Sequence, residues 1–237
     1  MARRSTTVAV ITADIIASSR YSRRDRQRLD RVLRAAFRET ERRFRGAIYT
    51  RMAFRITAGD EFQCVIADVP RVFEILTYVR AVAATGGLEP PLRFRASVGV
   101  GEISVTKRTS PYEEDGTAFV RSRHGLENLS KGRGPTRWTK LVTGYSDKNA
   151  AADAVLCLAD HILEGWTVPQ WGAVRWAILR LTREAIARRL KIAHQNVTKR
   201  LLAAGWPHLK PALGFLGQLL AEAIRTHEAV QRPYAPS

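Results

Sequence analysis

Cysteine is scarce in this chain: Cys64 and Cys157 are the two that occur among its 237 residues. Neither belongs to a CxxC pair or has a His at ligand spacing, which argues against a zinc site and against a disulfide framework. Both lie in apolar stretches, and buried free thiols are typical of a reducing compartment.

Long apolar runs are missing as well. No stretch of the sequence reaches the roughly 18 residues that a membrane-spanning helix needs. The first four residues, MARR, lead directly into a predicted strand, without the polar flank and cleavage site of a signal peptide. We therefore expect a cytoplasmic protein that does not insert into a membrane.

Acidic residues are few compared with basic ones. The chain has 39 Lys and Arg against 22 Asp and Glu, which leaves a net charge of +17 at pH 7. An excess of this size favours a polyanionic partner, such as nucleic acid, nucleotides or an acidic membrane surface.

The sequence does contain a regular succession of strand-like and helix-like patterns. Apolar runs predict strands at 8–16, 47–57, 62–67 and 92–100, and helical spacing predicts helices at 18–44 and from Pro70 to Gly86. The resulting order of strand, helix, hairpin, helix and strand is the split βαβ arrangement of ferredoxin-like and palm domains. Later patterns predict a helix at 117–130, a strand at 138–143 and a helix at 148–163.

Composition changes at residues 164–169, and every later pattern is helical. We therefore predict an α+β chain with a ferredoxin-like or palm domain at 1–164 and an all-α helix-turn-helix domain at 165–230. Residues 231–237 are predicted to be a flexible tail.

Acidic residues stand where two predicted strands end. Asp14 closes the first strand, and Asp60 with Glu61 lies in the hairpin after the first helix. In a strand–helix–hairpin fold these places are neighbours, and adjacent carboxylates repel each other unless a proton or a metal ion intervenes. Gly59 permits close backbone approach, and Ile15 offers a carbonyl oxygen. Because Mg²⁺ and Mn²⁺ prefer oxygen ligands, Asp14, Ile15, Asp60 and Glu61 are candidate ligands for either ion.

A plainer interpretation stays open for the same residues. Asp14 then caps the next segment, Asp60 serves a turn, where Asp is common, and Glu61 lies outside any ligand set. Three arginines alternate outward on the predicted sheet and either bind phosphates or face solvent: Arg55, Arg93 and Arg95.

The residues around these carboxylates resemble known motifs. Residues 58–62, AGDEF, are close to the GGDEF signature of diguanylate cyclases, and residues 12–16, TADII, are similar to the metal-binding first strand of class III nucleotidyl cyclases and polymerase palm domains. Residues 97–102, SVGVGE, and 115–123, DGTAFVRSR, resemble later cyclase segments. Across nearly all its length, the chain is most similar to the SatD family.

This resemblance implies a nucleotidyl cyclase-like domain that binds a nucleoside triphosphate with Mg or Mn, at a site completed in a homodimer. It implies that Gly59 and Arg123 lie beside the nucleotide. Two positions depart from the class III pattern: Val120 replaces an Asn, and Arg123 stands one residue before the expected Arg. In an active domain, Asp14 and Asp60 would hold the two ions that activate a ribose 3′-hydroxyl and stabilise the leaving pyrophosphate.

Residues 182–205 have the spacing of a helix-turn-helix. Thr182 fits an N-cap, and apolar positions predict a small core made by Ala185, Ile186, Leu190, Ile192, Val197 and Leu201. The second helix is predicted to begin near His194 and to present side chains suited to the bases and phosphates of double-stranded DNA: His194, Gln195, Asn196, Thr198, Lys199 and Arg200. Modules of this pattern also bind protein partners or support dimers.

Two functions follow from the sequence. In the first, the chain is a DNA-binding regulator whose palm-like domain senses a nucleotide without converting it. In the second, it is a metal-dependent nucleotidyl cyclase or nucleotidyltransferase, and its helical part only positions or dimerises it. The pair of carboxylate sites favours the second. The departures at Val120 and Arg123 and the polar face of the second helix of the helix-turn-helix favour the first, which is our prediction from the sequence.

Overall fold

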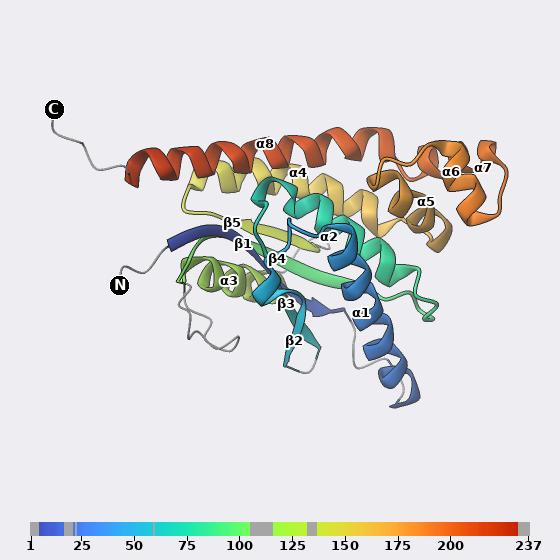
Figure 1. The fold of residues 1–237 in the computed structure, drawn as a ribbon, viewed down its shortest axis with the longest axis horizontal. Coiled ribbons are helices and arrows are strands. Elements are labelled where there is room, and N and C mark those ends of the chain that lie inside the picture. Colours follow the sequence, from blue (N-terminus) through green and yellow to red (C-terminus); the bar gives the residue numbers. More distant parts are fainter. Residues whose placement is uncertain are drawn as a thin grey trace.

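A five-stranded mixed sheet lies at the centre of the chain, with helices on both of its faces (Figure 1). A computed structural model describes residues 5–16, 21, 23–58, 60–104, 116–131 and 137–231. The strand order is β2-β3-β1-β4-β5; β1 runs antiparallel to β3 and β4, and β5 runs parallel to β4. The strands are β1 (Ser5–Ile15), β2 (Arg55–Ala58), β3 (Glu61–Ile66), β4 (Phe94–Ser104) and β5 (Thr139–Val142). The fold is therefore of the mixed α+β class that the sequence predicts.

Apart from the consecutive strands β2 and β3, helices alternate with the strands as far as β5, and every later described element is a helix. Their bounds are α1 (Arg23–Arg43), η2 (Thr50–Met52), η3 (Val69–Arg71), α2 (Val72–Ala84), α3 (Thr117–Lys131), α4 (Ser146–Glu164), α5 (Val168–Ile178), α6 (Arg183–Leu190), α7 (His194–Ala203) and α8 (Trp206–Gln231). Residues 232–237 of the predicted tail lie outside the described part of the chain.

Strand β1 is buried on both faces because helices cover both sides of the sheet. Ala9 and Ile11 belong to the main core, which α1 and α2 share. Val8 and Val10 point the other way and pack with Phe119 of α3 in a second cluster. Near-continuous apolar character in β1 is the pattern that burial on both faces requires.

Helix α3 packs directly onto the backbone of β4. A Cβ atom added at Gly99 would lie 2.2 Å from the carbonyl oxygen of Ala118, and one added at Gly101 would lie 2.4 Å from Oγ1 of Thr117. No ordinary side chain fits into either space. The glycines of the SVGVG run therefore bring α3 against the sheet.

The first part of the predicted hairpin is wrong. A strand was expected at 47–57, but β2 begins only at Arg55, and residues 50–52 form η2 instead. Apolar residues of this segment are buried without forming a regular strand. Ile48 makes an isolated bridge to Ile66, and Met52 packs in the second cluster with Val8 and Val10. In addition, α1 begins at Arg23, and residues 18–20 and 22 of the predicted helix lie outside the described residues.

The C-terminal helices pack against the sheet layer. Helix α8 runs back along α4 in Figure 1, and α5 contacts α2. Trp171, Leu216 and Leu220 belong to the same core cluster as Ile11 of β1. Residues on both sides of position 164 thus contribute to one core, and the division into domains at 1–164 and 165–230 stays a prediction. No described helix has the length and apolar character needed to cross a membrane.

A buried charged network attaches β5 to α2 and α4. Asp160 accepts hydrogen bonds from the backbone N–H groups of Trp138 and Thr139, each at 2.8 Å. Arg80 donates to the Trp138 carbonyl and the Thr139 hydroxyl, also at 2.8 Å. Burial lowers the pKa of Arg80 to about 10, although Asp160 opposes this shift. Burial also raises the pKa of Asp160, although Arg80 and the hydrogen bonds oppose it.

Glu39 on α1 joins the sheet layer to the C-terminal helices. Its carboxylate accepts from the Tyr78 hydroxyl at 2.9 Å and from Nη2 of Arg175 on α5 at 2.6 Å. Burial alone would raise the pKa of Glu39. The hydrogen bonds from Arg175 and Tyr78, together with nearby positive charge, have the larger combined effect, so the pKa lies below its ordinary value.

Stability should therefore depend on pH through Glu39. A carboxyl whose pKa is lowered by folding stabilises the fold above its unfolded pKa, and this contribution disappears as the pH falls through the folded value. We expect Glu39→Gln to lower the free energy of unfolding by about 1–3 kcal/mol at pH 7. The difference from wild type should shrink below pH 4.5, the ordinary value. Urea unfolding at several pH values measures it, and a constant difference would contradict this role.

Candidate functional site

Helices α6 and α7 form a short helix pair at one end of the molecule (Figure 1). Thr182 caps α6 as predicted, because its hydroxyl accepts the N–H of Ala185 at 3.3 Å. Lys191 ends α6 in the left-handed conformation, with φ 54°. The second helix begins at His194, which confirms the predicted start.

A small separate core holds these two helices together. Ile186 and Val197 are 1% and 0% exposed, and Ala187 is buried beside them. Leu190, Ile192 and Leu201 pack around this core as predicted. Ala185 was predicted in this core but is only half-buried. Ala187 takes its place because the buried face of α6 lies one residue further along the helix.

The outer face of α7 carries the predicted DNA-contacting residues. His194, Gln195, Asn196 and Lys199 are exposed, and two more are half-buried: Thr198 and Arg200. The first three occupy the first turn of α7, from which a recognition helix contacts base edges. The structure therefore brings all six of these side chains to the surface or its margin.

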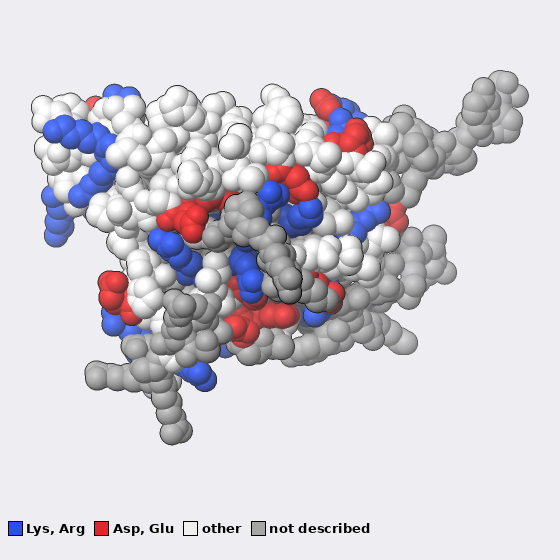
Figure 2. Space-filling view, turned by 180° about the vertical axis from the view of Figure 1, so that it is seen from behind, with Lys and Arg blue, Asp and Glu red and all other residues white. Residues whose placement is uncertain are grey.

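Positive charge surrounds this helix pair. Residues 180–210 contain eight Lys and Arg, and Glu184 is the one acidic residue among them. Figure 2 shows Lys and Arg gathered at the end of the molecule that carries α6 and α7. A surface of this sign attracts the phosphate backbone of nucleic acid.

Trp176 fixes the helix pair onto the rest of the chain, a role that the sequence does not reveal. Three guanidinium groups lie over its ring, those of Arg43, Arg175 and Arg189, with centroid distances of 5.7, 4.9 and 4.6 Å. They come from α1, α5 and α6. Arg43 is far from Trp176 in the sequence, and a contact over such a separation leaves no local pattern.

The predicted acidic site lies at one end of the sheet. Asp14 on β1 stands between Glu61 on β3 and Arg95 on β4 in the strand register. The backbone N–H of Ile15 donates to the carbonyl oxygen of Asp60 at 3.2 Å, so the hairpin tip and the end of β1 are neighbours, as predicted. Gly59 lies outside the described residues.

Arginines already contact the carboxylates of this site. Nε of Arg95 donates to Oδ1 of Asp14 at 3.0 Å, and Nη2 of Arg95 pairs with the other oxygen. Arg123 on α3 lies 3.9 Å from Glu61. The two other arginines named from the sequence also contact protein groups: Arg55 donates to Gln63, and Arg93 lies over the ring of Trp138.

Polar side chains continue from this end along the face of the sheet that α3 covers. The hydroxyls of Thr12 and Ser122 lie 2.8 Å apart, and Gln63 donates to Thr12 at 3.3 Å. These three residues are buried. Their mutual hydrogen bonds satisfy groups that burial would otherwise leave unpaired.

The residues at the sheet end do not form a two-metal site as they stand. Across the described residues, no group of three or more His, Cys, Asp or Glu is placed to hold a metal ion. Arg95 contacts both carboxylate oxygens of Asp14 and so competes with an ion for this ligand. The predicted ligands Asp14, Ile15, Asp60 and Glu61 for Mg or Mn remain a prediction, and no catalytic step through an ion follows from this geometry.

Comparison with known proteins identifies a family. A solved regulator of polyketide synthase expression from Bifidobacterium adolescentis aligns over 95% of this chain and 83% of its own, with 14% sequence identity and a TM-score of 0.27. At this identity and TM-score, the similarity supports no conclusion about the fold or function of this chain. No curated protein matches the sequence. The model of the SatD family matches residues 7–208. The chain therefore belongs to the SatD family.

Proposed function

We propose that this protein is a DNA-binding regulator that contacts the major groove with α7. The observation that carries the proposal is the exposed first turn of α7, held on a small buried core and surrounded by cations. Gln and Asn side chains can pair bidentately with adenine. Gln195 and Asn196 supply these groups, and Lys199 and Arg200 supply charges for the flanking phosphates.

A regulator of this kind usually binds as a dimer, with two reading helices one helical turn of DNA apart. We accordingly propose a homodimer on a site with two half-sites. The exposed Leu202 on α7 and Phe215 on α8 are apolar residues available to such a contact.

Selection of bound duplexes from a random library tests this function. The selected duplex should bind at least about 10³-fold more tightly than a scrambled duplex at physiological salt. Affinity for both duplexes should fall steeply as salt rises, because binding releases counterions. Equal affinity for the two duplexes at every salt concentration would contradict a sequence-specific regulator.

As a second function, we propose that the sheet end binds the phosphates of a nucleoside triphosphate through Arg95 and Arg123. The observation that favours it is the presence of two guanidinium groups beside the end of β1, each already oriented by a carboxylate. Arg is suited to this role because its planar group can bind a phosphate through two hydrogen bonds. Such a domain would be a sensor; the alternative remains a metal-dependent nucleotidyl cyclase or nucleotidyltransferase.

Arg123→Gln should weaken triphosphate binding by about tenfold, since one charged hydrogen bond contributes about 1.5–3 kcal/mol. Thermal shift with each of the four ribonucleoside triphosphates, with and without Mg²⁺ or Mn²⁺, measures this effect. Arg31→Gln, an exposed change on α1, is the control. No stabilisation of wild type by any triphosphate would contradict nucleotide sensing. Pyrophosphate release that disappears in Asp14→Asn would establish the enzymatic alternative.

A further inference from the structure

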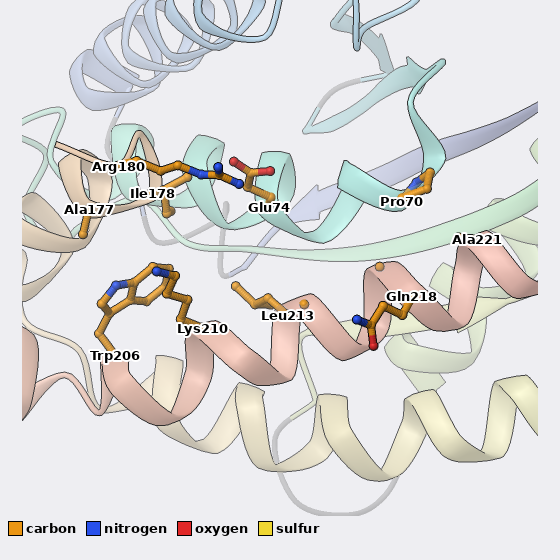
Figure 3. Close-up of a pocket in the computed structure, with 12 residues that line it drawn as sticks. Pro70, Glu74, Ala177, Ile178, Arg180, Trp206, Lys210, Leu213, Gln218 and Ala221 are labelled. Carbon is orange, nitrogen blue, oxygen red and sulfur yellow. The ribbon is translucent and has the colours of Figure 1, made fainter.

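A pocket of about 400 Å³ lies between α8, the end of α5 and the start of α2 (Figure 3). Its lining includes neither the carboxylates at the sheet end nor the exposed residues in the first turn of α7. A volume of this size falls in the range of about 300–1,000 Å³ that small-molecule sites occupy. Neither of the functions proposed above uses this pocket.

The walls of the pocket are mainly apolar. Ile178 of α5 and Trp206 and Leu213 of α8 line it, together with Pro70. Gly214 also lines the pocket, and a Cβ atom added there would meet no atom within 4 Å. Apolar walls with open space beside them favour an apolar ligand body.

The charged groups at the pocket are positive on balance. Figure 3 shows Arg180 and Glu74 on one side of the space and Lys210 with Trp206 on the other. Glu74 is already neutralised by Arg71, at 3.0 Å. Within the described part of the chain, no carboxylate is at ion-pair distance from Arg180 or Lys210. These two cations at the pocket are suited to an anionic group on a ligand.

Arg180 occupies a backbone position where glycine is the usual residue. Its φ is 58°, in the left-handed region, just after α5. The N–H of Leu181 donates to the carbonyl of Trp176, and the N–H of Arg180 to that of Ala177, which is the hydrogen-bond pattern of a helix end closed by glycine. An L-residue in this conformation costs about 1–2 kcal/mol. Glycine would fit this backbone position at a lower cost.

We propose that this pocket binds a small amphipathic carboxylate, with its apolar body between α5 and α8 and its carboxylate at Arg180 and Lys210. The site adjoins both connections to the α6–α7 pair: Arg180 precedes the Thr182 cap by two residues, and Trp206 begins α8 directly after the turn at Gly205. A bound ligand therefore orders the two segments that orient α6 and α7. Its consequence for DNA affinity rests on the function proposed above.

Titration calorimetry with decanoate tests the site, with decan-1-ol as the neutral probe of equal chain length. Gly214→Phe fills the open space without a backbone clash and should weaken decanoate binding by at least about tenfold, whereas Gly214→Ala should retain binding. Arg180→Gly should leave the melting temperature unchanged or raise it. It should weaken the binding of decanoate by about tenfold and leave the binding of decan-1-ol unchanged. Lys191→Gly is the matched control, because Lys191 also has a left-handed backbone but lies outside the pocket.

Hydrogen exchange with and without decanoate gives the second measurement. Protection is expected at residues 178–186 and 203–210 in wild type and should be absent in Gly214→Phe. The proposal would be overturned by any of three results: no binding of decanoate, equal binding of decan-1-ol, or unchanged binding in Gly214→Phe. Protection confined to other segments would overturn the link to α6 and α7. Neither measurement contains DNA, so a failure of the DNA-binding function gives a separate result.

Discussion

Replacing Asp160 with Ala is expected to lower the free energy of unfolding by about 3–5 kcal/mol, the usual loss when one member of a buried charged pair is removed. Asp160 is 1% exposed, and its carboxylate accepts the N–H groups of both Trp138 and Thr139. In the variant, these two donors are buried without an acceptor, and the charge of Arg80 is buried without its counter-charge. The start of β5 then loses its attachment to α4.

Asp153→Ala is the matched control for this prediction. Asp153 lies on the same helix and pairs with Lys140 and Arg137, but 29% of its side chain is exposed. Because water partly screens these half-buried pairs, the loss of Asp153 should cost less, about 1 kcal/mol. Urea unfolding followed by circular dichroism measures both variants, with Asp160→Asn to separate the loss of charge from the loss of volume. Equal stability of the two Ala variants would contradict the role given to Asp160.

The second large effect is expected at the first turn of α7. The double variant Gln195→Ala/Asn196→Ala should lose about 2–6 kcal/mol of affinity for the selected duplex, because each bidentate base contact contributes about 1–3 kcal/mol. Its affinity for a scrambled duplex should stay unchanged, since neither side chain carries a charge that binds phosphates. Both residues are exposed, so the fold itself should not be affected.

The control is the double variant Gln27→Ala/Asn128→Ala, which removes one exposed Gln and one exposed Asn elsewhere. Lys199→Ala gives the complementary result: it should weaken binding to both duplexes and reduce the slope of affinity against salt by about one. Fluorescence anisotropy at several salt concentrations measures all four proteins. If Gln195→Ala/Asn196→Ala reduced the affinity for both duplexes equally, the proposal that α7 contacts specific bases would be contradicted.

Local patterns in the sequence predicted many elements well. The Thr182 cap, the start of α7 at His194 and the burial of Ile186 and Val197 all follow from residues within about twenty positions of each other. The same holds for the helix at 117–130 and the strand at 138–143, which the structure places within one residue at each end. The predicted strand at 47–57 was wrong in its first part, residues 47–54, because apolar residues there are buried in the core without pairing along a strand.

Contacts between distant residues account for what was missed. The ion pair of Asp14 with Arg95 was missed because Arg95 lies 81 residues away and becomes its neighbour only through the pairing of β1 with β4. The arginines around Trp176 come from three helices. The pocket beside Gly214 exists only because α8 returns along the sheet layer.

The sequence by itself determined the order of the elements, the position of the helix pair and the charge around it. These depend on the period of apolar residues, on capping groups and on composition, each of which acts over a few residues. Tertiary structure alone decided which charges meet, which carboxylates are neutralised and where a cavity remains. Those outcomes depend on Coulomb and packing interactions between groups that only the folded chain brings within a few ångströms.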